Sequence, residues 1–275
     1  MTKPLVSIVV PSYNQARYLP TALDSVMFQE YPNIELIICN HGSTDNTSRI
    51  IADFINSIES EKVSYLERMS DDGSKTLLRK HELRYPATRT VKVIESQENI
   101  GGTASYNEGF KAAEGEFCMY LVGDDYFFPH AISAMVDVFE KNSGLDVVYA
   151  DTFVVDDAGR ILQRLSKPEY SFEKCLADWF HLGVCRLYRR DLHLKCGYYD
   201  TDYRNANDYD MFLRFAMSGA KFQHLNRVLY GLRKHDPDNP DEPASWRDNG
   251  HRNLMRESII CAERAREWLK SKREA

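Results

Sequence analysis

Short apolar runs alternate with apolar helical stripes along the first 150 residues. Runs typical of buried strands cover residues 5–10, 34–39, 91–95, 117–122 and 146–150. Between the first two runs, Leu19, Leu23, Val26 and Met27 recur at helical spacing, and similar stripes follow the other runs. Strands that alternate with helices predict right-handed crossovers. We therefore expect an α/β fold with a Rossmann-like, mostly parallel central sheet flanked by helices.

The pattern changes after residue 150. Two short apolar segments flank Asp156-Asp157-Ala158-Gly159, which predicts a hairpin. Helices are predicted over residues 172–180, 209–218 and 246–270. Residues 68–89 are polar and charged and have no clear period, so we expect a long loop or an insertion there.

Charge and composition exclude some classes of protein. The net charge of -6 in 275 residues argues against a nucleic-acid-binding protein. No stretch reaches the ~18 apolar residues of a membrane span, and the N-terminus leads directly into a strand. The six cysteines are scattered without a CxxC pair, which is typical of reduced thiols. We expect a cytoplasmic protein, with at most a peripheral contact at the inner face of the membrane.

Two adjacent carboxylates follow the strand at 117–122, in Gly123-Asp124-Asp125. Open α/β sheets bind ligands outside the carboxyl ends of their strands. Carboxylates there suit Mg²⁺ or Mn²⁺, which bind through one or two carboxylates and the phosphates of a substrate. A strand-ending turn is the alternative, because glycine and aspartate are common turn formers. These three residues alone leave both interpretations open.

Further motifs occur along the chain in a fixed order. They are Val6-Ser7-Ile8-Val9-Val10-Pro11-Ser12-Tyr13-Asn14, Gly42-Ser43-Thr44-Asp45-Asn46-Thr47, Asn99-Ile100-Gly101-Gly102, Asn107-Glu108-Gly109, Gly123-Asp124-Asp125, Asn207-Asp208-Tyr209-Asp210 with Leu213-Arg214, and Arg233-Lys234-His235. Together they resemble the family 2 glycosyltransferases, which have the GT-A fold, and the resemblance covers about residues 4–235. It implies a nucleotide-sugar donor, a divalent Mn²⁺ or Mg²⁺ and inversion at the anomeric carbon.

The resemblance also implies a domain organisation and roles for single residues. Residues 1–240 would form the GT-A domain, with a nucleotide-sugar-binding half at 1–125 and an acceptor and catalytic half at 126–240, and residues 241–275 a C-terminal helical extension. Asp208 matches the general base, Asp125 the metal ligand, and His235 a histidine that approaches the metal or the diphosphate. The residues expected at the nucleotide-sugar donor are Pro11, Ser12, Tyr13, Asn14, Asn40, His41, Asn99, Gly101, Gly102, Asn107, Gly123, Asp124, Asp125 and Arg233.

One position departs from the family pattern. Asn40-His41 stands where relatives usually carry two acidic residues, the second of which often accepts the N–H of uracil. A neutral His41 can accept that hydrogen bond through a ring nitrogen, whereas a protonated one cannot. A UDP-sugar therefore remains the expected donor.

Several candidate residues also have a structural interpretation. Asp208 precedes an apolar helical stripe and suits a helix N-cap, with Asp210 as a second candidate for the base. Gly101 and Gly102 suit either a tight turn or a close approach to a ligand. His235 stands in a polar stretch, where a histidine is usually just solvated.

We expect an inverting, metal-dependent glycosyltransferase that acts on a hydroxyl of a glycan, lipid-linked or protein acceptor, as in the biosynthesis of a cell-surface polysaccharide. The alternative is a non-catalytic nucleotide-sugar-binding or scaffold protein, suggested by the lost acidity at Asn40-His41. A nucleotidyltransferase would need a basic, glycine-rich first loop, and a Rossmann oxidoreductase a G-x-G-x-x-G after the first strand; neither is present. A second copy of the chain is a further expected partner.

Overall fold

The computed structural model describes residues 3–69, 76–235 and 250–274. Nine strands of this part form one sheet in the order β5-β2-β1-β6-β10-β8-β11-β7, and β9 pairs with β8. Their bounds are β1 (Val6–Ser12), β2 (Ile34–His41), β5 (Arg89–Ser96), β6 (Phe117–Tyr120), β7 (Tyr126–Phe127), β8 (Val147–Val155), β9 (Ile161–Leu165), β10 (Arg186–Arg189) and β11 (Phe222–Arg233).

The half of the sheet built from β5, β2, β1 and β6 is parallel, as the sequence predicts. Val6 pairs with Ile34 on one side and with Phe117 on the other. Beyond β6 the sheet is mixed, because β10 runs antiparallel to both β6 and β8 while β11 is parallel to β8. The expected α/β fold with a mostly parallel central sheet is confirmed.

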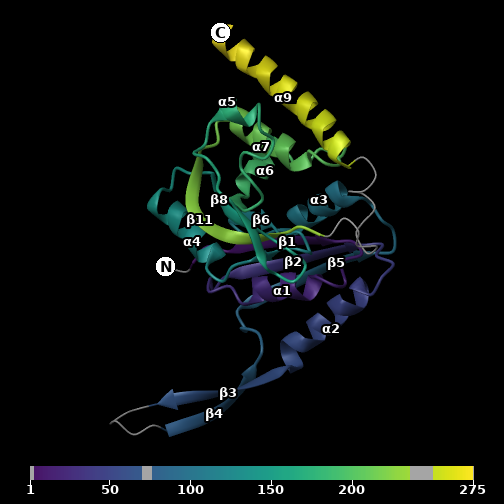
Figure 1. Ribbon diagram of the computed structural model, residues 1–275, viewed down its shortest axis with the longest axis vertical. Helices are drawn as coiled ribbons and strands as arrows, with labels where there is room; N and C mark the ends of the chain where they lie inside the picture. The colour runs from purple at the N-terminus through teal and green to yellow at the C-terminus, as the bar shows by residue number, and fades with distance from the viewer. Residues whose placement is uncertain (1–2, 70–75, 236–249, 275) are drawn as a thin grey trace.

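Helices cover both faces of this sheet (Figure 1). Ile8 of β1 packs in a buried cluster with α1, whereas its neighbour Val9 packs in a second cluster with Phe110 of α3. This alternation follows from the two-residue period of a strand. The helices are α1 (Leu19–Met27), α2 (Thr47–Ser60), α3 (Gly102–Ala112), α4 (Ala131–Lys141), α5 (Phe172–Cys175), α6 (Asp191–Cys196), α7 (Asn207–Met217) and α9 (Gly250–Glu274).

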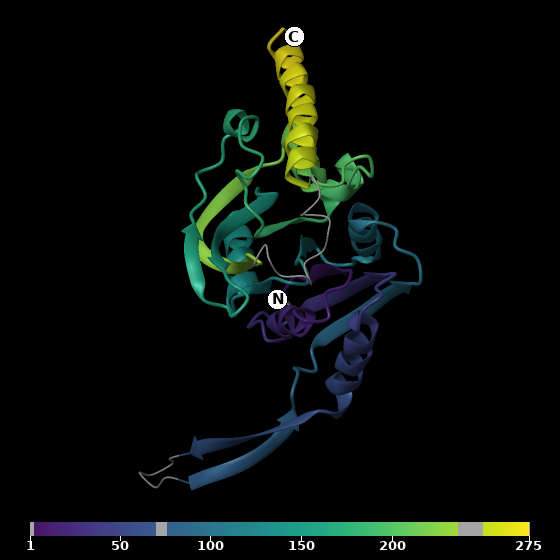
Figure 2. The same ribbon diagram turned by 45° about the vertical axis from the view of Figure 1, so that its right-hand side comes forward.

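The long helix α9 packs against the body from Leu254 to Leu269. Leu254, Cys261 and Ala265 are buried against α7, where Leu213 belongs to the same cluster. Figures 1 and 2 both show the C-terminal half of α9 extending away from the sheet. In the described ranges, no helix has the length and apolarity that crossing a bilayer requires.

The expected loop at residues 68–89 is wrong in part. Strands β3 (Lys62–Met69) and β4 (Thr76–Leu83) form a separate antiparallel hairpin, paired from Lys62↔Leu83 to Met69↔Thr76. The hairpin projects from the body on the side opposite to α9 (Figure 2). The sequence of these two strands lacks the regular apolar alternation by which a half-buried strand is recognised.

Other boundaries differ from the expectations. The helix predicted at 172–180 ends at Cys175, and the short elements β7, β10 and α6 and the long strand β11 were not predicted. The hairpin predicted around 156–159 is present between β8 and β9. The predicted domain boundary at residue 240 and the predicted helix start at Trp246 lie outside the described residues.

Candidate active site

The carboxyl ends of β1 and β2 are fixed to each other by the loops that follow them. Pro11 and Ser12 end β1 and are buried, while Tyr13 is exposed. Asn14, with φ of 55°, accepts at Oδ1 from the N–H of Thr44 at 2.8 Å. The structure therefore brings together the first two expected donor motifs, at residues 11–14 and 42–47.

Asn40 and His41 are both buried at the end of β2. The Asn40 side-chain amide donates to Ser48 at 2.8 Å and to Glu95 at 2.6 Å. Its N–H groups are therefore bonded to neighbouring side chains. His41 Nδ1 lies 2.9 Å from Ser105 Oγ. Burial lowers the pKa of His41, which favours the neutral imidazole that accepting a nucleobase N–H requires.

The motifs around α3 have local structural roles. Asn99 Oδ1 accepts from the N–H of Gly101, whose φ of 82° suits glycine at the residue before the helix. Gly102 has open space around it. Both hydrogen bonds of the Asn107 side chain go to the backbone of Tyr199, at 2.8 and 2.9 Å. This arrangement indicates that Asn107 joins α3 to the segment before α7.

Asp124 and Asp125 have different environments after Gly123. Asp125 is 2% exposed, and its two oxygens accept from the Tyr230 hydroxyl and the Arg233 N–H, each at 2.7 Å. Burial and the neighbouring charge of Asp124 raise the pKa of Asp125 well above its usual range. Asp124 instead meets His235, with 2.8 Å between Oδ2 and Nε2.

His235 bridges two carboxylates and is not a solvated loop residue. Its Nδ1 lies 2.9 Å from Asp157 Oδ1, which also accepts from the Tyr18 hydroxyl at 2.8 Å. The side chain of His235 is 11% exposed. The hydrogen bond to Asp124, helped by Asp157 and opposed by burial, raises the pKa of His235 to about 9.

Arg233 is committed to the backbone around this cluster. Its guanidinium donates to the carbonyls of Asp124, Asp156 and Asp157 at 2.8–3.0 Å. It also lies over the Tyr18 ring, 4.8 Å from the centroid. The arginine therefore ties the Gly123-Asp124-Asp125 segment to the β8–β9 hairpin.

Asp208 is not a helix N-cap. The cap position of α7 is Ala206, without a side-chain bond, and Asp208 lies in the first turn. Asp208 Oδ2 accepts from Arg186 Nη2 at 2.6 Å and from the Tyr120 hydroxyl at 3.2 Å. The second candidate base, Asp210, is fully buried and pairs with Arg214 at 2.8 Å, which indicates a structural role.

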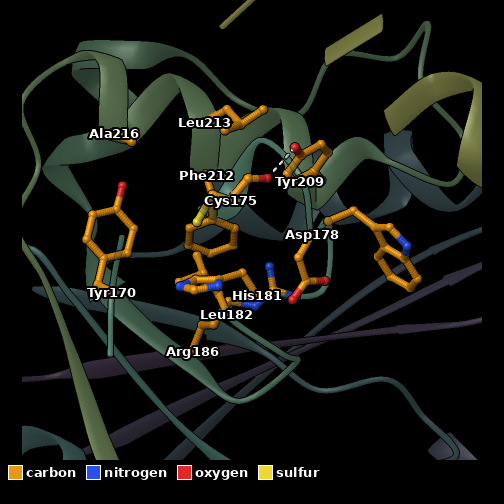
Figure 3. A pocket seen from close by; sticks show the side chains of 11 residues that line it. Tyr170, Cys175, Asp178, His181, Leu182, Arg186, Tyr209, Phe212, Leu213 and Ala216 are labelled. Atoms are coloured by element: carbon orange, nitrogen blue, oxygen red, sulfur yellow. Dashed lines mark hydrogen bonds between the residues drawn. The ribbon is translucent and has the colours of Figure 1, made fainter. Parts of the chain in front are cut away.

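A small pocket is lined in part by Arg186 (Figure 3). Its volume of about 10 Å³ is close to the space that one water molecule needs. His181 and Phe212 are among its lining residues. Arg186 Nε and His181 Nε2 are both buried and have no hydrogen-bond partner among the described residues.

Four side chains of this site were not predicted from the sequence: Tyr18, Tyr120, Asp157 and Arg186. Asp157 lies in the hairpin turn that the sequence predicts, but its pairing with His235 could not be predicted. Arg186 belongs to β10, which is only four residues long and was not predicted.

Asp124 and Asp125 offer two carboxylates, which are ligands that suit Mn²⁺ or Mg²⁺, and His235 adds an imidazole beside them. Within the described ranges, no three His, Cys, Asp or Glu side chains converge as a ready metal cage. These ions need only one or two carboxylates when a diphosphate supplies the other oxygens. The buried Asp125 beside Asp124 is also a place where a cation would relieve repulsion between like charges. The residues therefore fit such an ion.

Comparisons with known proteins give matches over most of the chain. The family model for glycosyl transferase family 2 matches residues 7–73 and 69–197. A chondroitin synthase of Escherichia coli is 27% identical over 261 residues, covering 93% of this chain and 33% of that protein. The chain spans 23–33% of the lengths of the synthases that it matches in this way.

Solved structures share the fold. S. aureus TarS 1-349 in complex with UDP superposes with a TM-score of 0.62 at 20% identity, over 83% of this chain and 60% of that one. The mannosyltransferase PcManGT from Pyrobaculum calidifontis, in complex with GDP-Man and Mn²⁺, has a TM-score of 0.59 at 15% identity, over 96% of this chain and 74% of that one.

Proposed function

The chain belongs to glycosyl transferase family 2, and on that premise we propose that it transfers a sugar, with inversion, from a nucleotide-diphosphate donor to an acceptor hydroxyl. The proposed organisation is a donor half at residues 1–125, an acceptor half at 126–240 and a helical extension at 241–275. One observation carries the proposal. Tyr120 is the last residue of β6, and two residues separate it from Gly123-Asp124-Asp125. Its hydroxyl donates a hydrogen bond to Asp208, so the donor motif and the candidate base belong to one connected site.

The donor side needs a stabilised diphosphate leaving group. Asp124, Asp125 and His235 would hold Mn²⁺ or Mg²⁺, which supplies Lewis-acid stabilisation of that leaving group when bound. Tyr230 and the backbone of Arg233 keep Asp125 in place, and Asp157 keeps the His235 ring in place. The carboxylates of the site and the hydrogen bonds that orient them are therefore in place without a bound ligand.

The acceptor side needs a base on the face opposite to the leaving group. We assign this role to Asp208, whose side chain is 26% exposed and so is accessible to a hydroxyl. The acceptor oxygen forms the new bond to the anomeric carbon, the bond to the diphosphate breaks, and Asp208 takes the hydroxyl proton. General-base catalysis of this kind contributes about 10²–10⁴-fold.

The nucleobase of the donor and the class of acceptor are proposed from His41 and from the names of similar proteins. A neutral, buried His41 at the end of β2 suits the N–H of uracil, and TarS is a structural neighbour solved with UDP. We propose a UDP-sugar donor on this basis. The matched synthases are named for chondroitin, which supports a glycan acceptor in polysaccharide synthesis.

Calorimetric titration with UDP, GDP and dTDP, each with and without Mn²⁺, tests the donor site. We expect UDP to bind in a metal-dependent way and Asp125→Ala to abolish that binding. Failure of all three nucleotides to bind a folded protein would contradict the proposal. Binding without any donor hydrolysis, or hydrolysis that survives in Asp208→Ala, would favour the non-catalytic alternative or another base.

A further inference from the structure

Arg186 is a buried cation in the middle of the sheet. It lies on β10, between β6 and β8, and is 4% exposed. Its guanidinium lies 4.5 Å from the ring centroid of Phe212 on α7 and 5.6 Å from that of Tyr120 on β6. Nη2 donates to the Tyr120 hydroxyl at 2.8 Å and to Asp208 Oδ2 at 2.6 Å.

This buried charge restricts Asp208. In the described part of the chain, the carboxylate that pairs with Arg186 is that of Asp208. A buried guanidinium without a partner is strongly unfavourable, so the pair resists separation. The second carboxylate oxygen, Oδ1, accepts from the N–H of Tyr209 at 2.7 Å. Both oxygens are therefore held while part of the side chain stays accessible.

The hydrogen bond from Arg186 to Tyr120 links the restrained Asp208 carboxylate to the donor side of the site. Tyr120 ends β6, and the next residues lead into Gly123-Asp124-Asp125. Arg186 thus connects the side chain that would accept the proton with the strand that carries the donor carboxylates. A base must face the attacking hydroxyl with accurate geometry, because a misplacement of about 1 Å can cost about 10²-fold in rate.

We propose that Arg186 is the positioning residue of the base: it fixes the Asp208 carboxylate relative to the donor motif. The proposal rests on the assignment of Asp208 in the proposed function. Arg186 acts through Asp208 and does not touch the acceptor, because its side chain is buried in the sheet, whereas the Asp208 side chain is 26% exposed.

The first test compares two arginines of the same strand. Arg186→Met removes the guanidinium but keeps a long side chain. Arg189→Met is the matched control, because Arg189 pairs with Glu116 at 2.8 Å and has no contact with Asp208. We expect Arg186→Met to lower the turnover of a hydrolysable UDP-hexose about 10²-fold with unchanged calorimetric affinity for UDP and Mn²⁺. Arg189→Met is expected to keep wild-type turnover.

A double-mutant cycle separates positioning from a general structural role. If Arg186 acts through Asp208, the double variant Asp208→Ala/Arg186→Met has the same residual turnover as Asp208→Ala alone. Losses that multiply would overturn the proposal, as would wild-type turnover in Arg186→Met. Wild-type turnover in Asp208→Ala would instead reject the proposed base, which is a distinguishable failure.

Thermal melting supplies a readout that needs no substrate. Asp208→Ala leaves Arg186 buried and unpaired, so we expect the double variant to melt at a higher temperature than Asp208→Ala. A double variant that melts lower, with additive losses, would show that the two residues are not coupled. Arg186→Lys, which keeps the charge without the planar fork, is expected to recover stability more than turnover.

Discussion

Two clusters of the candidate site hold their carboxylates with different cations. The donor cluster consists of Asp124, Asp125, His235 and Asp157, and its cation is an imidazolium. The base cluster consists of Asp208, Arg186 and Tyr120, and its cation is a guanidinium that does not lose its proton in proteins. A titratable cation can give up its proton when a metal ion takes over the charge. The donor cluster is therefore suited to exchange its cation, and the base cluster to keep a fixed geometry.

The largest expected effect separates the two clusters. Asp208→Ala should lower turnover by about 10²–10⁴-fold, because the acceptor proton loses its base. The affinity for UDP with Mn²⁺ should stay unchanged, since the donor cluster is intact. Kinetics and calorimetry on the same preparation check this, with Asp208→Asn as the isosteric control. A matching loss of UDP affinity would mean that the clusters are not separable.

The pH dependence of stability should come from the donor cluster. The pKa of His235 is raised from 6.5 to about 9 in the folded protein, so its protonation stabilises the fold. This contribution is complete below about pH 6.5 and is lost as the pH rises through about 9. Urea denaturation without metal should show a loss of roughly 3 kcal/mol across that window for the wild type relative to His235→Gln. Equal pH slopes for the two proteins would contradict this.

Asp157 sharpens the comparison because its carboxylate contacts His235, the cation of the donor cluster. A carboxylate that orients a metal-binding histidine typically contributes 10–100-fold to metal affinity, so Asp157→Asn should weaken Mn²⁺ binding by about that factor. Electron paramagnetic resonance titration of Mn²⁺ measures it without turnover. Asp156→Asn is the control, because the Asp156 side chain bonds within the same turn and not to His235. Equal Mn²⁺ affinity in the two variants would remove Asp157 from the metal site.

The smallest expected effect lies in the base cluster. Tyr120→Phe removes one neutral hydroxyl and leaves the pair of Arg186 and Asp208 in place. A single hydrogen bond contributes about 0.5–1.5 kcal/mol, so turnover should fall about 2–10-fold with no change in UDP affinity. A loss as large as that of Arg186→Met would mean that the hydroxyl, and not the guanidinium, fixes Asp208.

Much of the donor side was predictable because it follows single strands. The apolar runs at 5–10, 34–39 and 117–122 became β1, β2 and β6, and the polar residues after them meet at one edge of the sheet. The hairpin β3–β4 was not predictable as strands, since its sequence lacks the apolar alternation that marks a half-buried strand. The N-cap interpretation of Asp208 failed because the helix begins at Asn207, two residues earlier than the predicted start at residue 209.

The sequence by itself determined the family, the α/β class and the buried strands, and it singled out Asp124, Asp125 and Asp208 as candidate site residues. Only the tertiary structure decided their partners. Arg186 meets Asp208 across 22 residues, and His235 meets Asp157 across 78. These pairs depend on the order of β6, β10, β8 and β11 in the sheet. A periodicity of two or 3.6 residues tells which face a side chain takes, but not which distant segment lies opposite.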